Sequence, residues 1–266
     1  MTRDHRDDAA DGKIAWRCKS CEKILEMEND AAVARPHEDD STESAKQTVE
    51  KNVLTVLHWN AWGLKGKMDE LVERLAKDEV DVAMIQETKL KEGRDSTPIA
   101  KGFSFLRCDR KGANGGGLAI LVRTNISFEK VKESQKGGTE VQEIRVKMGK
   151  NSWLGLSNVY VSPEGNVGFS TEMRLETIST NGIVAGDFNA HHEAWDEFKA
   201  ADARGEEIFE WAVEKNLGVL NEGDATRLDP ATLDPSAPDI TLVDPKWQSK
   251  CTWSVGEDIG DRTTYR

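Results

Sequence analysis

The polar residues best suited to chemistry follow a short apolar run near residue 185. Residues 182–186 are apolar with turn-prone neighbours, which predicts a buried strand, and Asp187 and Asn189 lie where this strand ends. Residues i and i+2 of a strand point to the same side, so a proton acceptor and a hydrogen-bond donor would lie together at a sheet edge. Such a pair suits hydrolysis, although an ordinary strand end with an Asx turn has the same sequence.

Three other predicted strand ends carry polar residues that could converge on this pair, namely Asn60, Glu87 and Tyr160. Each residue alone is ordinary for a strand end or a turn. Together they suit metal-assisted hydrolysis of a phosphate ester, because Glu87 is a hard oxygen ligand for Mg²⁺ and Asn60 would support the metal or a phosphate oxygen. Asp187 would deprotonate the attacking water. Asn189 and Tyr160 would donate hydrogen bonds to the charge that develops on phosphorus.

The surrounding pattern predicts a layered α/β fold. Strands at 53–60 and 80–86 flank an amphipathic helix that starts near Met68, which indicates a crossover unit. Three glycines at 115–117 lack the spacing and the following helix of a dinucleotide site, so they favour close strand packing. Further helices are expected at 173–178 and 204–215, and further strands at 103–107, 117–122, 126–131, 141–148, 153–160, 218–220, 239–243 and 251–255.

Composition sets bounds on the function. The 266 residues, 37% of them hydrophobic, suffice for one large core and contain no apolar run of membrane-spanning length. The amino terminus is polar and acidic, so we expect no signal peptide, no membrane partner and an intracellular protein. The net charge of −12 counts against a surface that wraps duplex DNA, although a bound divalent cation would reverse the sign locally.

The first fifty residues differ from the rest. Residues 1–50 are acidic and poor in core-forming side chains, so we expect this segment to be disordered and residues 52–266 to form the folded domain. Cys18 and Cys21 form a lone CxxC pair, which supplies two of the four ligands of a structural zinc site. Zinc binding and an unpaired remnant of such a site are the two interpretations.

Five short motifs resemble, in their order, those of the endonuclease/exonuclease/phosphatase superfamily. Within it, the sequence looks most like the apurinic-type endonuclease domain of non-LTR retrotransposons. The stretch from Asn189 to Trp195 and the residues before Asp239 resemble the ingi-type elements of trypanosomes. The resemblance covers roughly residues 52–259. The five motifs are Trp59-Asn60-Ala61-Trp62-Gly63, Gln86-Glu87-Thr88, Tyr160-Val161-Ser162-Pro163, Gly186-Asp187-Phe188-Asn189 and Pro238-Asp239-Ile240-Thr241.

The resemblance implies a four-layered α/β sandwich of two packed mixed sheets, like that of DNase I, with the site at one end. It implies that Asn60 and Glu87 lie at a Mg²⁺ (or Mn²⁺) ion. It also implies that Tyr160 and Asn189 contact the scissile phosphate and that Asp187 handles the nucleophilic water.

The end of the sequence departs from the family pattern. The equivalent of Asp239 orients a histidine of a terminal Ser-Asp-His motif, but no histidine follows His192. The residues from Asp261 onward can be encoded by bases that read Ser-Asp-His-Leu-Pro in the neighbouring frame. We therefore hypothesise a frameshift that removed the motif and a closing strand.

The function that the resemblance implies is Mg²⁺-dependent phosphodiester hydrolysis by a retrotransposon-type endonuclease that nicks target DNA. A full-length element would join it to a reverse transcriptase domain and bring it to nuclear DNA. Two alternatives stay open: a catalytically inactive, truncated remnant of that domain, and a small-molecule phosphoesterase of the same superfamily.

Overall fold

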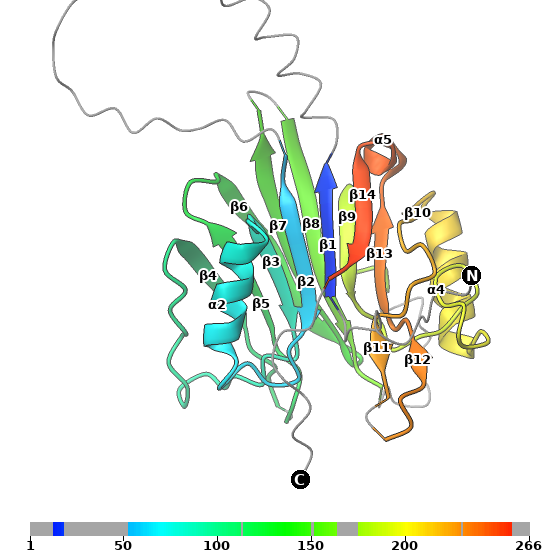
Figure 1. Cartoon of the computed structure of the whole chain (residues 1–266), viewed down its shortest axis with the longest axis horizontal. Helices are drawn as coiled ribbons and strands as arrows, with labels where there is room; N and C mark the ends of the chain where they lie inside the picture. Colours follow the sequence, from blue (N-terminus) through cyan, green and yellow to red (C-terminus); the bar gives the residue numbers. More distant parts are fainter. Residues whose placement is uncertain are drawn as a thin grey trace, which may run out of the picture.

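Two six-stranded mixed sheets pack face to face, and a helix lies on the outer face of each (Figure 1). The computed structural model describes residues 53–112, 114–149, 152–163, 175–229 and 231–256, together with the backbone of residues 13–18. This arrangement of helix, sheet, sheet and helix confirms the predicted four-layered α/β sandwich.

The first sheet has the strand order β14-β1-β2-β3-β5-β4. β2 and β3 are parallel and are joined by helix α2, so the predicted crossover unit is confirmed. The apolar stripe of α2, with Leu71 and Leu75, packs on the outer face of this sheet against Leu57 and Ile85. The elements are β1 (Lys13–Cys18), β2 (Thr55–Asn60), α2 (Met68–Lys77), β3 (Val82–Gln86), β4 (Phe103–Cys108), β5 (Leu118–Arg123) and β14 (Cys251–Val255).

The second sheet has the order β10-β13-β9-β8-β7-β6, in which only the β8–β9 pair is parallel among the described strands. Its strands are β6 (Phe128–Lys136), β7 (Thr139–Met148), β8 (Ser152–Val161), β9 (Gly182–Asp187), β10 (Gly218–Val219) and β13 (Asp239–Val243). A separate two-stranded sheet pairs β11 (Arg227–Leu228) with β12 (Pro235–Ser236).

Helix α4 (Ala203–Glu214) covers the outer face of the second sheet. The Asp202 side chain caps it by accepting a hydrogen bond from the Gly205 N–H at 2.7 Å, and Ile208 and Trp211 belong to the same buried cluster as Phe188. A short helix, α5 (Pro245–Gln248), precedes β14. None of the helices in the described ranges combines the length and the apolar character needed to cross a membrane.

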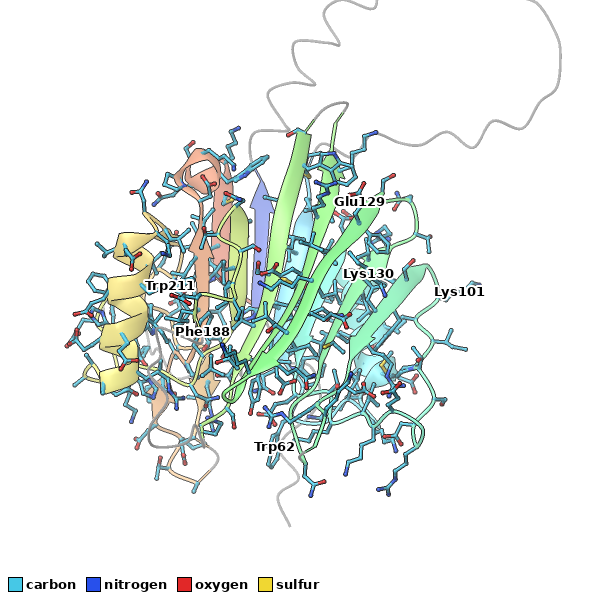
Figure 2. The ribbon with its side chains drawn as sticks, turned by 180° about the vertical axis from the view of Figure 1, so that it is seen from behind. Trp62, Lys101, Glu129, Lys130, Phe188 and Trp211 are labelled. Atoms are coloured by element: carbon cyan, nitrogen blue, oxygen red, sulfur yellow. The ribbon has the colours of Figure 1, made fainter. Side chains whose placement is uncertain are left out.

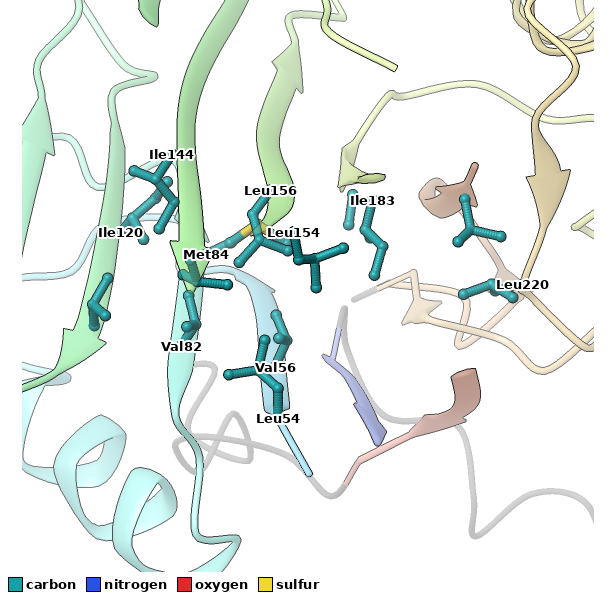
Figure 3. Close-up of a cluster of buried hydrophobic side chains, with 14 of the residues drawn as sticks. Leu54, Val56, Val82, Met84, Ile120, Ile144, Leu154, Leu156, Ile183 and Leu220 are labelled. Atoms are coloured by element: carbon teal, nitrogen blue, oxygen red, sulfur yellow. The ribbon is translucent and has the colours of Figure 1, made fainter. Parts of the chain in front are cut away.

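The space between the sheets holds a large apolar cluster, to which Met84 and Ile120 contribute from the first sheet and Leu156 and Ile183 from the second (Figure 3). One polar contact crosses this layer close to the site. The Gln86 side-chain amide donates to Asn158 Oδ1 at 2.6 Å, and the Asn158 amide donates to the backbone oxygens of Ile85 and Ala119 at 3.2 and 3.1 Å. Both amide side chains are fully buried.

The structure differs from the sequence-based expectation in a few elements. The strand expected at 126–131 runs later, over Phe128–Lys136, because its long antiparallel pairing with β7 extends toward the turn at residues 137–138. Within the segment expected to be disordered, residues 13–18 form β1, which pairs antiparallel with both β2 and β14. The helix expected at 173–178 lies partly outside the described residues.

The close contact between β8 and β9 generates a stability prediction. A Cβ added at Gly186 would lie 1.8 Å from the backbone oxygen of Val159, so the two strands would have to separate. We expect Gly186→Ala to lower the free energy of unfolding by about 1–3 kcal/mol in urea denaturation followed by circular dichroism. Val213→Ala, on the exposed side of α4, is the control and should change it by less than about 0.5 kcal/mol. Equal values for Gly186→Ala and the parent protein would contradict the prediction.

Candidate active site

Four predicted site residues lie at one edge of the sandwich. Asn60 ends β2, Glu87 follows β3, Tyr160 lies near the end of β8 and Asp187 ends β9. Register places Asn60 beside Gln86 in the first sheet and Tyr160 beside Asp187 in the second. Because parallel strands end at the same edge, each sheet supplies two of these residues, and the packing of the sheets brings the two pairs together.

Direct hydrogen bonds join the four side chains. Asn60 Nδ2 donates to Glu87 Oε1 at 3.1 Å and to Asp187 Oδ2 at 2.7 Å. The Tyr160 hydroxyl donates to Glu87 Oε1 at 3.1 Å. Residues that are up to 127 positions apart in the chain therefore form one polar cluster.

The other two predicted residues lie beside this cluster. The Asn189 backbone N–H donates to Asp187 Oδ1 at 2.9 Å, and the Asn189 side-chain amide donates to the Val161 backbone oxygen at 2.9 Å. Asp239 is the register partner of Asp187 on β13, and its Oδ2 accepts the hydroxyl of Thr226 at 2.8 Å. All six predicted residues thus lie at one end of the sandwich.

The loops that carry the site have unusual backbone conformations. Trp62, Glu87, Lys89 and Asn189 have φ values of 44°, 49°, 53° and 46°, in the left-handed region that non-glycine residues seldom adopt. The loops after β2 and β3 are held together by backbone bonds, among them one of 2.7 Å from the Gly63 N–H to the Glu87 oxygen. Such strained residues are typical of functional sites and persist when neighbouring contacts enforce them.

Lysine and arginine side chains that the motifs did not reveal contact the cluster. Lys89 Nζ lies 3.2 Å from Glu87 Oε2, and the Arg110 guanidinium carbon lies 5.3 Å from the centre of the Tyr160 ring. Arg110 also forms an ion pair with the buried Glu140. One feature of the sequence could have indicated Arg110, since this residue lies between a predicted strand end and the three glycines at 115–117. Its partner Glu140, 30 residues later, had no motif.

The glycine run lets the chain pass close to Arg110 and Glu140. A Cβ added at Gly116 would lie 2.2 Å from Glu140 Oε1 and 2.3 Å from Arg110 Nε. The next residue, Gly117, donates its N–H to Glu140 Oε2 at 2.8 Å. Close packing is therefore present at Gly116 and Gly117, but it is packing against side chains and not the strand packing that was expected; a Cβ at Gly115 would meet no atom within 4 Å.

Burial tunes the protonation of two site residues. Burial raises the pKa of Asp187 from 3.8 to about 6, although hydrogen bonds from Asn60 and the Asn189 N–H oppose the shift. Burial also raises the pKa of Tyr160, and the carboxylates of Glu87 and Asp187 raise it further. Near neutral pH, Asp187 is therefore a carboxylate with appreciable proton affinity, and Tyr160 stays a hydrogen-bond donor.

The donor set fits a hard divalent cation. Glu87 and Asp187 bring carboxylate oxygens to the same amide, and Mg²⁺ usually takes one or two carboxylates and completes its shell with water. The described residues contain no group of three or more His, Cys, Asp and Glu side chains arranged for a metal. Asn60 is oriented with its nitrogen toward the carboxylates, while its oxygen accepts the Trp62 N–H at 2.9 Å. Glu87 is therefore the better candidate ligand, and Asn60 acts here as the donor between two carboxylates.

The histidines of the described region have other environments. His58 is fully buried, and burial lowers its pKa to about 3. His191 Nδ1 lies 2.7 Å from Asp196 Oδ2, and the His192 ring stacks on Phe209 with ring centres 4.2 Å apart. Among the hydrogen bonds of the described residues, none joins these rings to Glu87 or Asp187. The residues from Asp261 onward, where the frameshift was hypothesised, lie outside the described part of the chain.

The lone CxxC pair falls largely outside the described residues. Cys18 ends β1, where its register partner is Cys251 on β14, and Cys21 is not described. This end of β1 lies opposite Thr55, at the start of β2, whereas the site lies at the other end of β2. Zinc binding by this pair stays a prediction that is separate from the site.

A cavity of 670 Å³ lies beside the cluster. Its lining includes Arg107, Cys108 and Glu133, and Cys108 packs against Tyr160 from within a small buried group. Burial raises the pKa of the Cys108 thiol to about 11, so the thiol is neutral near pH 7. None of the six predicted site residues lines this cavity, which has charges of both signs.

Comparison with known proteins gives a consistent result. Residues 154–260 match a family model described as endonuclease-reverse transcriptase. The chain is 26% identical over 181 residues to a probable RNA-directed DNA polymerase from transposon BS of Drosophila melanogaster, which covers 66% of this chain and 19% of that protein. It is also 26% identical over 188 residues to the RNA-directed DNA polymerase from mobile element jockey of Drosophila funebris, which covers 70% of this chain and 20% of that protein. The chain thus spans about a fifth of the length of these relatives.

Solved structures share the fold. The endonuclease domain of TRAS1, a telomere-specific non-LTR retrotransposon, aligns with a TM-score of 0.57 and 24% identity, covering 72% of this chain and 84% of that domain. An AP endonuclease, LMAP from Leishmania major, aligns with a TM-score of 0.58 and 15% identity, covering 76% of this chain and 87% of that protein. The narrower likeness to ingi-type elements stays a prediction. The chain is thus similar in sequence to retrotransposon polymerase proteins and to a model of endonuclease-reverse transcriptases, and it shares its fold with the endonuclease domain of a non-LTR retrotransposon.

Proposed function

We propose that this domain hydrolyses phosphodiester bonds of DNA with a bound Mg²⁺ ion and nicks the target DNA of a retrotransposon. The observation that carries the proposal is the hydrogen-bonded cluster of Asn60, Glu87, Tyr160 and Asp187, to which both sheets contribute. The partners implied are DNA and, in a full-length element, a reverse transcriptase domain, as the names of the relatives suggest. Its place of action would be the nucleus.

Each residue of the cluster has a role that its geometry supports. Asp187 accepts the proton of the attacking water, since Asn60 and the Asn189 N–H hold its carboxylate and burial raises its proton affinity. Tyr160, which stays protonated, donates to a phosphate oxygen, and Asn189 is the second donor. Glu87 holds the metal. Bound Mg²⁺, or Mn²⁺ in its place, supplies Lewis-acid stabilisation of the phosphate charge.

Asp239 has a supporting role in this proposal. It lies next to Asp187 in register, with its carboxylate held by Thr226. In the family pattern the equivalent residue orients a histidine. Among the histidines of the described region, His191 lies against Asp196, His192 stacks on Phe209 and His58 is fully buried. This observation favours a second candidate, a remnant that binds metal or DNA without turnover.

Plasmid nicking separates the two candidates. We expect supercoiled DNA to be nicked with Mg²⁺ and left intact with EDTA, and Glu87→Gln to lower the rate at least about 100-fold because it removes the metal ligand. Glu129→Gln, on the exposed strand β6, is the matched control and should leave the rate unchanged.

The outcomes of this assay are distinct. An equal rate for Glu87→Gln would contradict the assigned site. Complete inactivity of the parent chain, with nicking gained when Ser-Asp-His-Leu-Pro replaces the residues from Asp261 onward, would establish the remnant. Hydrolysis of a phosphoinositide with no action on DNA would instead indicate a small-molecule phosphoesterase.

Protonation of Asp187 generates a prediction for the metal-free protein. Its folded-state pKa of about 6 exceeds the ordinary 3.8, so between these values the native state binds more protons than the unfolded state. Stability from this group therefore falls as pH rises from about 4 to about 6 and is level above that range. Urea denaturation in EDTA measures the unfolding free energy of Asp187→Asn and of the parent. As pH rises from about 4 to about 6, we expect the variant to become more stable relative to the parent.

Asp229→Asn serves as the control for the pH series. Backbone N–H donors at Thr232 and Ala231 lower the pKa of Asp229 below its ordinary 3.8, so its effect on stability has the opposite sign to that of Asp187. The difference in unfolding free energy between Asp229→Asn and the parent should change only slightly from pH 4 to 6, and in favour of the parent. A flat profile for Asp187→Asn would show that Asp187 has an ordinary pKa.

A further inference from the structure

An indole side chain projects from the rim of the site. Trp62 is 58% exposed, and the view with side chains shows it at the end of the sandwich, at the edge of the molecule (Figure 2). Among the large hydrophobic side chains exposed in the described ranges, Phe198 is the other aromatic, at 44%. The Trp62 backbone N–H donates to Asn60 Oδ1 at 2.9 Å, so this residue is anchored to the polar cluster.

The position of the indole is held by the loops on both sides. Its backbone has a φ of 44°, and the neighbouring Gly63 N–H bonds to the Glu87 oxygen at 2.7 Å. The Lys89 ammonium lies 4.7 Å from the centre of the indole ring and 3.2 Å from Glu87 Oε2. A cation at this distance from a tryptophan ring is attracted to it. Lys89 thus contacts both the Trp62 ring and Glu87, the candidate metal ligand.

This environment suits a nucleotide. Every base has a π-face that stacks on an aromatic side chain, and proteins that hold unpaired strands combine such rings with cations that follow the phosphates. The loops after β2 and β3 carry four lysines, at positions 65, 67, 89 and 91, of which Lys89 contacts the indole. The net charge of −12 limits general attraction of phosphates, so a contact that does not depend on charge gains importance.

We propose that Trp62 is a stacking site for a nucleobase of an unpaired nucleotide next to the phosphate that is cut. The inference rests on the proposed function in one respect, because it takes the reacting phosphate to lie at Glu87 and Asp187. The ligand chemistry is a base in single-stranded or locally opened DNA, read through its flat face and not through its hydrogen-bonding edge. In this proposal Lys89 orients the indole ring. Because the ring contacts only the flat face of the base, binding does not depend on the DNA sequence.

The test compares oligonucleotides with and without bases. Fluorescence anisotropy in EDTA would measure the affinity for a short labelled oligothymidylate and for an abasic oligonucleotide of equal length. We expect Trp62→Ala to weaken binding of the oligothymidylate about tenfold and to leave abasic binding unchanged. Trp62→Phe should retain most of the affinity, since a smaller ring still stacks. The loss caused by Trp62→Ala should also persist as salt is raised.

Controls keep the result interpretable. Phe198→Ala removes the other exposed aromatic and should change neither affinity, and equal unfolding midpoints for all variants would show intact folding. The inference is overturned if the parent binds the oligothymidylate no more tightly than the abasic strand, or if Trp62→Ala weakens both equally. A parent that prefers the base-bearing strand through Trp62 but does not nick plasmid would retain the stacking site and lose the proposed activity.

Discussion

One buried amide pair holds the two sheets at the spacing that the site requires. Gln86 and Asn158 join across the core, and Asn158 also bonds the backbone of both β3 and β5. Glu87 is the next residue after Gln86, and Tyr160 lies two residues beyond Asn158 on the same face of β8. The bond between the Tyr160 hydroxyl and Glu87 therefore depends on this bridge. Gln86 Oε1 has no hydrogen-bond partner in the described part of the chain, so the pairing is incomplete. The directional bond to Asn158 still favours one arrangement of the sheets, where apolar packing alone would tolerate several.

The site combines features that oppose stability. Asp187 and Glu140 are buried carboxylates, and four residues of the surrounding loops hold left-handed backbones. Each feature is compensated locally: Asn60 and the Asn189 N–H bond Asp187, while Arg110 and the Gly117 N–H bond Glu140. Left-handed backbones and buried carboxylates that occur together in this way are typical of functional sites.

Much of this arrangement was predictable because it follows from local patterns. An alternating pattern predicted β2, a compact apolar run predicted β3 and the apolar stripe predicted α2. The positions of four polar residues at strand ends implied a shared edge, namely Asn60, Glu87, Tyr160 and Asp187. The contacts that escaped prediction join segments that are distant in sequence. The Arg110–Glu140 pair depends on how β4 and β7 meet, and the Lys89 contact with Glu87 depends on two left-handed backbones in one turn. The amide orientation of Asn60 follows from a local bond with the Trp62 N–H, which the residue types of the motif do not reveal.

Strand β1 has a consequence for any shortened form of this protein. It lies between β2 and β14 and pairs with each along its length, although its residues precede β2 by dozens of positions. A recombinant fragment starting at Asn52 would keep all five motifs, yet it would leave rows of backbone amides and carbonyls without partners on β2 and β14. Open strand edges of this kind recruit other chains. Residues 13–18 are therefore best regarded as part of the sandwich, and aggregation of a domain trimmed of them would reflect a lost strand and not intrinsic insolubility.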